Sequence, residues 1–162
     1  MSRPKIKLSQ AAGPIIWLMA DHGGWDLGQK IYQWLLRDGY RVVDLSSHRR
    51  QPNDDYPKLA LRLARRVVQN KNSLGLAICR TGTGMAIAAN KVAGVRAATA
   101  SSSQGAKRAR YEENINILCL GADFTPWRLV PAIVQSWLKS PRSRPWRYQR
   151  RLQQLMRLDH AR

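Results

Sequence analysis

The chain has 162 residues, of which 44% are hydrophobic and 23% charged, and this suits one globular domain and excludes a disordered chain. Its 28 lysine and arginine residues against 10 acidic residues give a formal net charge of +18, which favours anionic substrates or polyanionic partners. No apolar run reaches the roughly 20 residues of a membrane span, and the basic N-terminus lacks the apolar segment of a secretory signal. We therefore expect a cytoplasmic protein with no membrane partner.

The cysteine and histidine residues argue against a metal. Cys79 and Cys119 are far apart in the sequence, with no CxxC spacing, so neither a disulfide framework nor a zinc site is indicated. The histidines also lack metal-ligand spacing. We expect no metal site.

Short apolar runs alternate with amphipathic stretches along the chain. Strands are expected at 14–20, 40–46, 74–79, 95–100 and 115–122. Helices are expected at 25–38 and 57–70, after the RTGTG turn, behind a serine cap between the last two strands, from Thr125-Pro126 to about 138, and at about 147–158. This alternation predicts an α/β, Rossmann-like three-layer fold with a five-stranded parallel sheet, helices on both faces and a C-terminal helical tail.

Composition also divides the chain into three parts. Residues 1–13 read as a disordered basic lead-in, 14–140 as the folded domain, and 141–162 as a basic C-terminal arm.

The sharpest local pattern is Cys79-Arg80-Thr81-Gly82-Thr83-Gly84, at a strand end and before a helix. Glycines allow backbone N–H groups to approach an anion, and the helix N-terminus adds partial positive charge that favours a thiolate. A tight turn beneath a buried cysteine would give the same pattern.

Asp21-His22 directly follows the first strand, and three serines, 101–103, follow the fourth. Since ligands of such folds bind at the carboxyl ends of the strands, these groups and the 79–84 loop should converge on one site. His22 could bind a phosphate, with Asp21 orienting it or a sugar hydroxyl. An Asx-type helix start with a surface histidine is the simpler alternative.

Four motifs, in this order and spacing, resemble the type B sugar-phosphate isomerases, which are ribose-5-phosphate isomerase B and its galactose-6-phosphate isomerase relatives. The motifs are ADHGG (20–24), DDYP (54–57), ICRTGTGMAIAANKVAGVRAA (78–98) and NINILCLGA (114–122). The resemblance covers roughly residues 14–151. It implies aldose–ketose isomerisation of a phosphorylated sugar, such as ribose 5-phosphate, through an enediolate and without metal or cofactor.

The resemblance also implies residue roles. Cys79 matches the proton-shuttling base, and the loop from Thr81 through Gly84 matches the anion hole. The remaining matches are sugar and phosphate contacts: Asp21, His22, Tyr56, Arg147 and Arg151.

Three residues depart from the family pattern. Glu112 and Glu113 stand where the family has a His-Asn pair that acts in ring opening, and Arg80 replaces a glycine. We assign Glu112 a catalytic acid–base role and assign Arg80 and Asn114 to substrate binding.

Family members are dimers with sites between subunits, so the resemblance implies that the 141–162 arm packs on a partner, with a dimer or a tetramer left open. Two alternatives remain. The basic–aromatic tail would suit a catalytically degenerate member that binds RNA or a ribonucleoprotein. A weak subunit that works only with a paralogous partner is the other.

Overall fold

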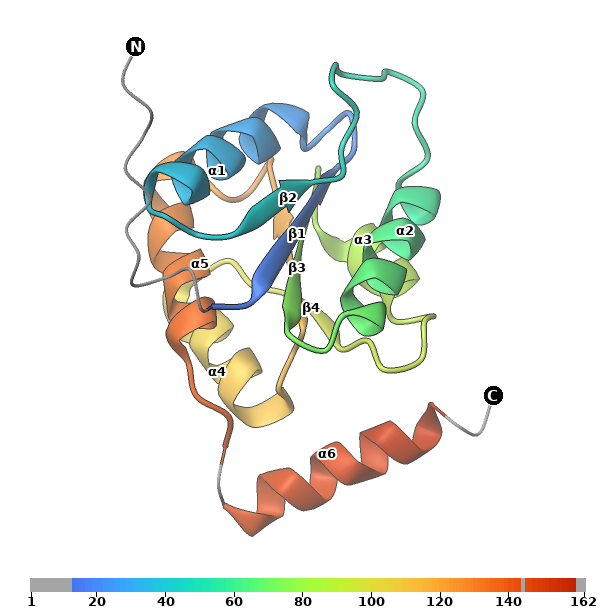
Figure 1. Cartoon of the computed structure of the whole chain (residues 1–162), viewed down its shortest axis with the longest axis vertical. Coiled ribbons are helices and arrows are strands. Elements are labelled where there is room, and N and C mark those ends of the chain that lie inside the picture. The colour runs from blue at the N-terminus through green and yellow to red at the C-terminus, as the bar shows by residue number, and fades with distance from the viewer. Residues whose placement is uncertain (1–12, 144, 160–162) are drawn as a thin grey trace.

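A five-stranded parallel sheet forms the centre of the structure, a computed structural model that describes residues 13–143 and 145–159 (Figure 1). Its strand order is β2-β1-β3-β5-β4. The predicted fold class and all five strands are confirmed, and the strands predicted at 40–46, 95–100 and 115–122 are shorter than expected at both ends. The strands are β1 (Ile15–Ala20), β2 (Val42–Asp44), β3 (Ser73–Cys79), β4 (Ala97–Thr99) and β5 (Ile117–Gly121).

Helices cover both faces of the sheet and give the predicted three layers (Figure 1). One face packs against α1 (Trp25–Arg37), α4 (Ser103–Glu113) and α5 (Val130–Lys139), and the other against α2 (Tyr56–Gln69) and α3 (Thr83–Ala89). The central strands β3 and β5 are buried along nearly their whole length. Such continuous apolar strands are typical of a parallel sheet covered on both sides.

The C-terminal helix α6 (Trp146–Leu158) lies outside the three layers, next to the end of α4 (Figure 1). The rings of Tyr111 and Tyr148 meet edge to face with centroids 6.0 Å apart, and Asp159 Oδ2 accepts a hydrogen bond from Gly94 N–H at 2.9 Å. The apolar side chains of Trp146 and Leu158 remain exposed. The predicted tail helix is therefore present and held to the body by few contacts.

The helix expected from Thr125-Pro126 begins later than the sequence indicated. Pro126 is extended, with ψ at 144°, and a short 3₁₀ helix, η2 (Trp127–Leu129), precedes α5 at Val130. Pro126, and not Thr125, occupies the N-cap position of this 3₁₀ helix. The prediction of an N-cap at Thr125 was wrong because Pro126 itself stays extended, so the first helical turn begins one residue later than predicted.

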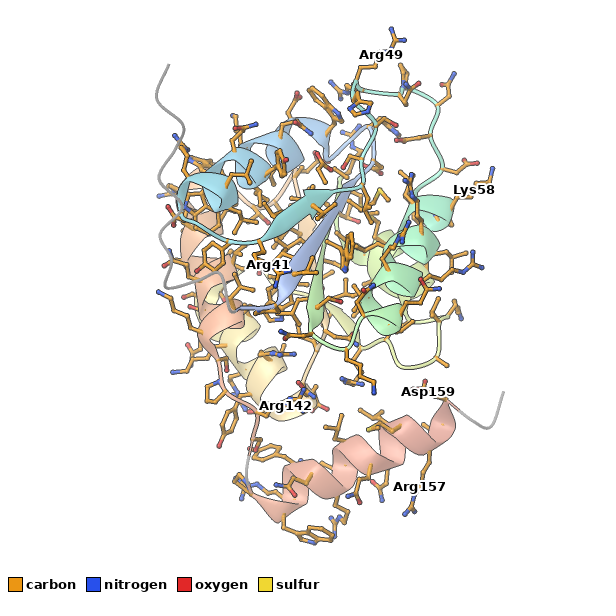
Figure 2. All side chains as sticks on the ribbon, in the orientation of Figure 1. Arg41, Arg49, Lys58, Arg142, Arg157 and Asp159 are labelled. Atoms are coloured by element: carbon orange, nitrogen blue, oxygen red, sulfur yellow. The ribbon has the colours of Figure 1, made fainter. Side chains whose placement is uncertain are left out.

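Basic side chains reach solvent throughout the view in Figure 2, from Arg49 in the loop before α2 to Arg157 on α6. The lead-in predicted for 1–13 falls almost wholly outside the described residues. Among the described residues, no helix is both long and apolar enough to cross a membrane.

The strand order places a switch point between β1 and β3. The chain passes from β1 to β2 on one side and then returns to β3 on the other. In open α/β sheets the crevice at such a point, beyond the carboxyl ends of the strands, is where ligands bind. We call this side of the sheet the carboxyl edge and the opposite side the amino edge.

Candidate active site

Cys79 is the last residue of β3 and lies at the switch point. It is 5% exposed, and the backbone N–H of Gly82 donates to its Sγ at 3.1 Å. Gly82 adopts a positive φ of 80° that favours glycine and turns the chain into α3, which begins at Thr83. The thiol is therefore next to a backbone donor and to the start of α3.

The loop 80–84, which we call the catalytic loop, rests directly on the end of β5. A Cβ on Gly121 would lie 2.7 Å from the carbonyl carbon and oxygen of Thr81. Backbone hydrogen bonds run from Ala122 N–H to the Cys79 carbonyl at 2.8 Å and from Asp123 N–H to the Arg80 carbonyl at 3.0 Å. The exit from β5 thus fixes the backbone that would surround a bound anion.

Asp21 follows β1 and is 5% exposed. Its Oδ1 accepts a hydrogen bond from Gly24 N–H at 2.8 Å. Burial raises the pKa of the Asp21 carboxyl, although the hydrogen bond from Gly24 opposes the shift. Gly24 itself has no room for a side chain, because a Cβ there would overlap the carbonyl of Ile78 on β3. Asp21 is therefore held beside Ile78, the residue before Cys79 at the end of β3.

His22 is oriented by Asp54, a residue in the loop before α2. The distance from His22 Nδ1 to Asp54 Oδ1 is 2.7 Å, and the same oxygen accepts from the His22 backbone N–H at 3.1 Å. Arg50 Nε donates to the His22 carbonyl at 2.8 Å. With Nδ1 engaged, Nε2 is the ring nitrogen left to contact a ligand.

Asp21, His22 and Asp54 also have ligand atoms within 4.8 Å of one another, close enough to hold a metal ion. The sequence predicted no metal, and that prediction stays open. Asp54 is the site residue that the sequence reasoning missed. The signal that could have found it is the DDYP motif, in which only Tyr56 received a role.

Tyr56 and Arg80 border the same edge. The Tyr56 ring lies on Gly84, where a Cβ would be 2.7 Å from Tyr56 Cε2. Arg80 crosses over Gly23 so closely that a Cβ on that glycine would overlap its side chain. Arg80 Nε pairs with Asp123 Oδ2 at 3.1 Å, and the arginine side chain is mostly exposed. Arg80 thus contributes positive charge at the mouth of the site without filling the catalytic loop.

The structure brings together the predicted residues of the carboxyl edge: Asp21, His22, Tyr56, Cys79, Arg80, Thr81, Gly82, Thr83 and Gly84. Thr83 N–H donates to Thr81 Oγ1 at 3.3 Å within the loop.

The other predicted residues lie at the amino edge of the same chain. Figure 1 shows that α4, which starts after β4, runs back along the sheet. Glu112 in its last turn and Asn114 directly after it therefore lie at that end. Glu112 pairs with Arg108 at 2.8 Å. Arg147 and Arg151 are on α6, where the Arg147 guanidinium stacks on Tyr148 at 4.8 Å. One chain therefore does not unite these residues with its own Cys79.

Comparisons with known proteins agree with this geometry. The family described as Ribose/Galactose Isomerase matches residues 16–155. The chain belongs to this family. It is 36% identical over 141 residues to ribose-5-phosphate isomerase B of Mycobacterium tuberculosis, with 87% of each chain covered. A D-erythrulose-4-phosphate isomerase of Pectobacterium atrosepticum is 37% identical over 119 residues, which are 74% of this chain and 78% of that one.

Solved structures give the same result. Ribose-5-phosphate isomerase B of Mycoplasma genitalium, with bound ribulose-5-phosphate, has a TM-score of 0.86 at 37% identity over 91% of this chain and 97% of that one. The Clostridium thermocellum enzyme has a TM-score of 0.85 at 35% identity and covers 91% and 98%. The chain is thus a sugar-phosphate aldose–ketose isomerase, an intramolecular oxidoreductase, as the sequence indicated.

Proposed function

We propose that the protein interconverts ribose 5-phosphate and ribulose 5-phosphate with Cys79 as the base. The observation that carries this proposal is the Cys79 thiol at the switch point, with Gly82 N–H 3.1 Å from its sulfur. The relatives at 36% and 37% identity that are named for ribose 5-phosphate or hold ribulose 5-phosphate support the choice of substrate.

The Cys79 thiolate removes the proton on C2 of the open-chain aldose. The electron pair of that C–H bond forms the C1–C2 double bond, and the carbonyl electrons move to O1 and give an enediolate. The Cys79 thiol, whose proton exchanges with solvent, then protonates C1, and the O2 hydroxyl proton passes to O1 to complete the ketose. No atom is gained or lost, so the reaction needs no co-substrate.

The catalytic loop stabilises the negative charge on O1. Gly82 and Gly84 have no Cβ, so a ligand oxygen can approach the backbone of the loop closely, and the N-terminus of α3 adds partial positive charge. Since Gly121 packs against Thr81, this arrangement is in place before the substrate binds. A preorganised anion site avoids reorganisation during the reaction.

The second group of predicted residues acts in the site of another copy of the chain. Glu112, Arg147 and Arg151 lie at the amino edge, away from their own Cys79. In the proposed dimer the two arginines bind the phosphate of the substrate held by the partner, for which a guanidinium pair is well suited. Glu112 assists ring opening there.

Mixing two inactive variants tests this shared site. Cys79→Ala and the double variant Arg147→Ala/Arg151→Ala should each lose activity, and co-refolding them in equal amounts should restore about a quarter of the wild-type activity, since about half of the random dimers contain one intact site. If the mixture stays inactive although heterodimers form, the two groups act within one chain and the shared site is wrong.

A substrate panel tests the choice of sugar. We expect the kcat/KM for ribose 5-phosphate to exceed that for D-erythrulose 4-phosphate, the substrate named for the Pectobacterium relative. If kcat/KM is higher for D-erythrulose 4-phosphate, that sugar replaces ribose 5-phosphate as the proposed substrate, and Cys79 remains the proposed base.

A further inference from the structure

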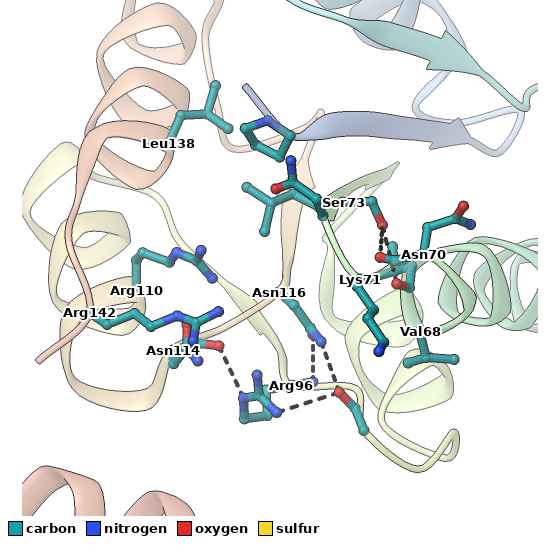
Figure 3. A pocket seen from close by; sticks show the side chains of 15 residues that line it. Val68, Asn70, Lys71, Ser73, Arg96, Arg110, Asn114, Asn116, Leu138 and Arg142 are labelled. Atoms are coloured by element: carbon teal, nitrogen blue, oxygen red, sulfur yellow. Dashed lines mark hydrogen bonds between the residues drawn. The ribbon is translucent and has the colours of Figure 1, made fainter. Parts of the chain in front are cut away.

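A cavity lined by basic side chains lies at the amino edge, on the side of the sheet opposite to Cys79 (Figure 3). Its volume is about 420 Å³, within the roughly 300–1,000 Å³ typical of small-molecule pockets. Four cationic residues line it, and no aspartate or glutamate is among its described lining residues. The cationic residues are Lys71, Arg96, Arg110 and Arg142. We call it the basic cavity.

Two of these arginines converge without a compensating acid. Figure 3 shows Arg110, from α4, and Arg142, from the segment after α5, extending toward the same part of the cavity. Burial lowers the pKa of Arg110 to about 10, and the charges of Arg142 and Arg96 add to that shift. Like charges at such a site repel each other, so an anion between them would stabilise both.

Arg96 differs from these two because an acidic residue, Asp159, acts on its charge. Its Nε donates to the Asn114 carbonyl at 3.0 Å, and Asp159 opposes the lowering of its pKa by burial. Arg96 therefore supports the loop at the cavity wall, and the uncompensated charges are those of Arg110, Arg142 and the exposed Lys71.

Polar atoms in the wall are also left without partners. Arg110 donates through one terminal nitrogen to the Ile115 carbonyl at 2.7 Å, but its Nε is buried with no partner. Asn114 is 7% exposed, and its Oδ1 is buried with no partner. Buried polar groups in folded proteins nearly always have a partner. A ligand in the cavity that accepts from Arg110 and donates to Asn114 would supply both.

We propose that the basic cavity binds a small phosphorylated compound whose phosphate pairs with Arg110 and Arg142. A phosphate dianion balances the two uncompensated guanidinium charges and matches their planar donor geometry. The cavity is larger than phosphate alone, so the rest of the compound occupies the space toward Asn70 and Ser73, whose polar groups line it. This cavity lies at the opposite edge of the sheet from Cys79 of the same chain, and its proposed ligand does not depend on the isomerase proposal. Asn114, which was predicted from the sequence to bind substrate, is part of its wall.

The test uses pyrophosphate as the probe, titrated into the full-length protein by calorimetry at low salt. Arg142→Gln removes an exposed cation and leaves the hydrogen bonds of the fold in place. We expect it to weaken pyrophosphate binding at least about tenfold, the effect of losing one charge-assisted hydrogen bond. Arg157→Gln, on the exposed side of α6, changes the net charge equally and should leave the affinity within about twofold.

Amide NMR spectra recorded during the same titration locate the bound anion. We expect shifts in Gly94, Asn114 and Asn116, the backbone around the basic cavity. Equal losses of affinity in the two variants, shifts confined to the catalytic loop, or no binding by the wild type would each overturn the proposal.

Discussion

Replacing Gly121 by alanine should impair catalysis by moving the catalytic loop. The added Cβ would lie 2.7 Å from the Thr81 carbonyl carbon and oxygen and 3.0 Å from its Cα. Favourable separations are about 3.5–4.0 Å, so the loop must move by about 1 Å. No rotamer change relieves a contact between a Cβ and a backbone. Gly82, next along the loop, is itself confined, because its Cβ position is 3.1 Å from the Leu120 carbonyl carbon.

A displacement of about 1 Å in a positioned group can cost about 100-fold in rate, and that is the loss of kcat expected for Gly121→Ala. Overpacking should also lower the free energy of unfolding by about 1–3 kcal/mol. Steady-state kinetics and urea unfolding measure the two effects. Gly105→Ala is the matched control, because its Cβ would meet one side-chain atom, the Ser102 hydroxyl oxygen at 3.1 Å, and no backbone. A Gly121→Ala protein that is destabilised but keeps the wild-type kcat would refute the proposal that Gly121, at the end of β5, positions the catalytic loop.

Three further outcomes follow from the structure. Asp21→Asn should raise the melting temperature at neutral pH and lower activity. Burial raises the pKa of Asp21 in the folded state, so the cost of ionising it is present above that pKa and disappears as pH falls toward 3.8. The melting temperatures of wild type and variant should therefore converge in acid, and a difference that is constant with pH would contradict the raised pKa. Ser102→Ala should cost about 1 kcal/mol of stability, because the Ser102 hydroxyl caps α4 by accepting from Gly105 N–H at 3.1 Å, whereas Ser101→Ala should be neutral in the same urea titration. Arg80→Ala breaks an exposed pair with Asp123 and should change stability by less than about 1 kcal/mol while raising the KM for the sugar phosphate; an unchanged KM would remove Arg80 from the binding site.

Much of the fold could be predicted because parallel strands have a simple signature. The runs at 15–20 and 74–79 are apolar and mostly buried, and they end in polar or glycine-rich turns. This is typical of strands covered on both faces. The start of α5 could not be predicted in this way. Pro126 suits either a first helical turn or an extended residue, and local sequence does not distinguish the two.

Some residues of the site could be predicted from the sequence, and others could not. Cys79, Asp21 and His22 could be placed together because all three follow strand ends, which a parallel sheet brings to one edge. The role of Asp54 depends on a loop of many residues folding back over His22, which no periodicity reveals. The convergence of Arg96, Arg110 and Arg142 likewise joins three distant segments of the chain. In the sequence these arginines are indistinguishable from the other basic residues.

The most direct test of the central claim is the formation of ribulose 5-phosphate from ribose 5-phosphate in deuterated water, followed by NMR for the wild type and Cys79→Ala. Cys119→Ala serves as the control, because Cys119 is buried within β5 and burial raises the pKa of its thiol. We predict that the wild type and the control form ketose with solvent deuterium at C1 and that Cys79→Ala forms none. Ketose formation by Cys79→Ala at the wild-type rate would contradict the account.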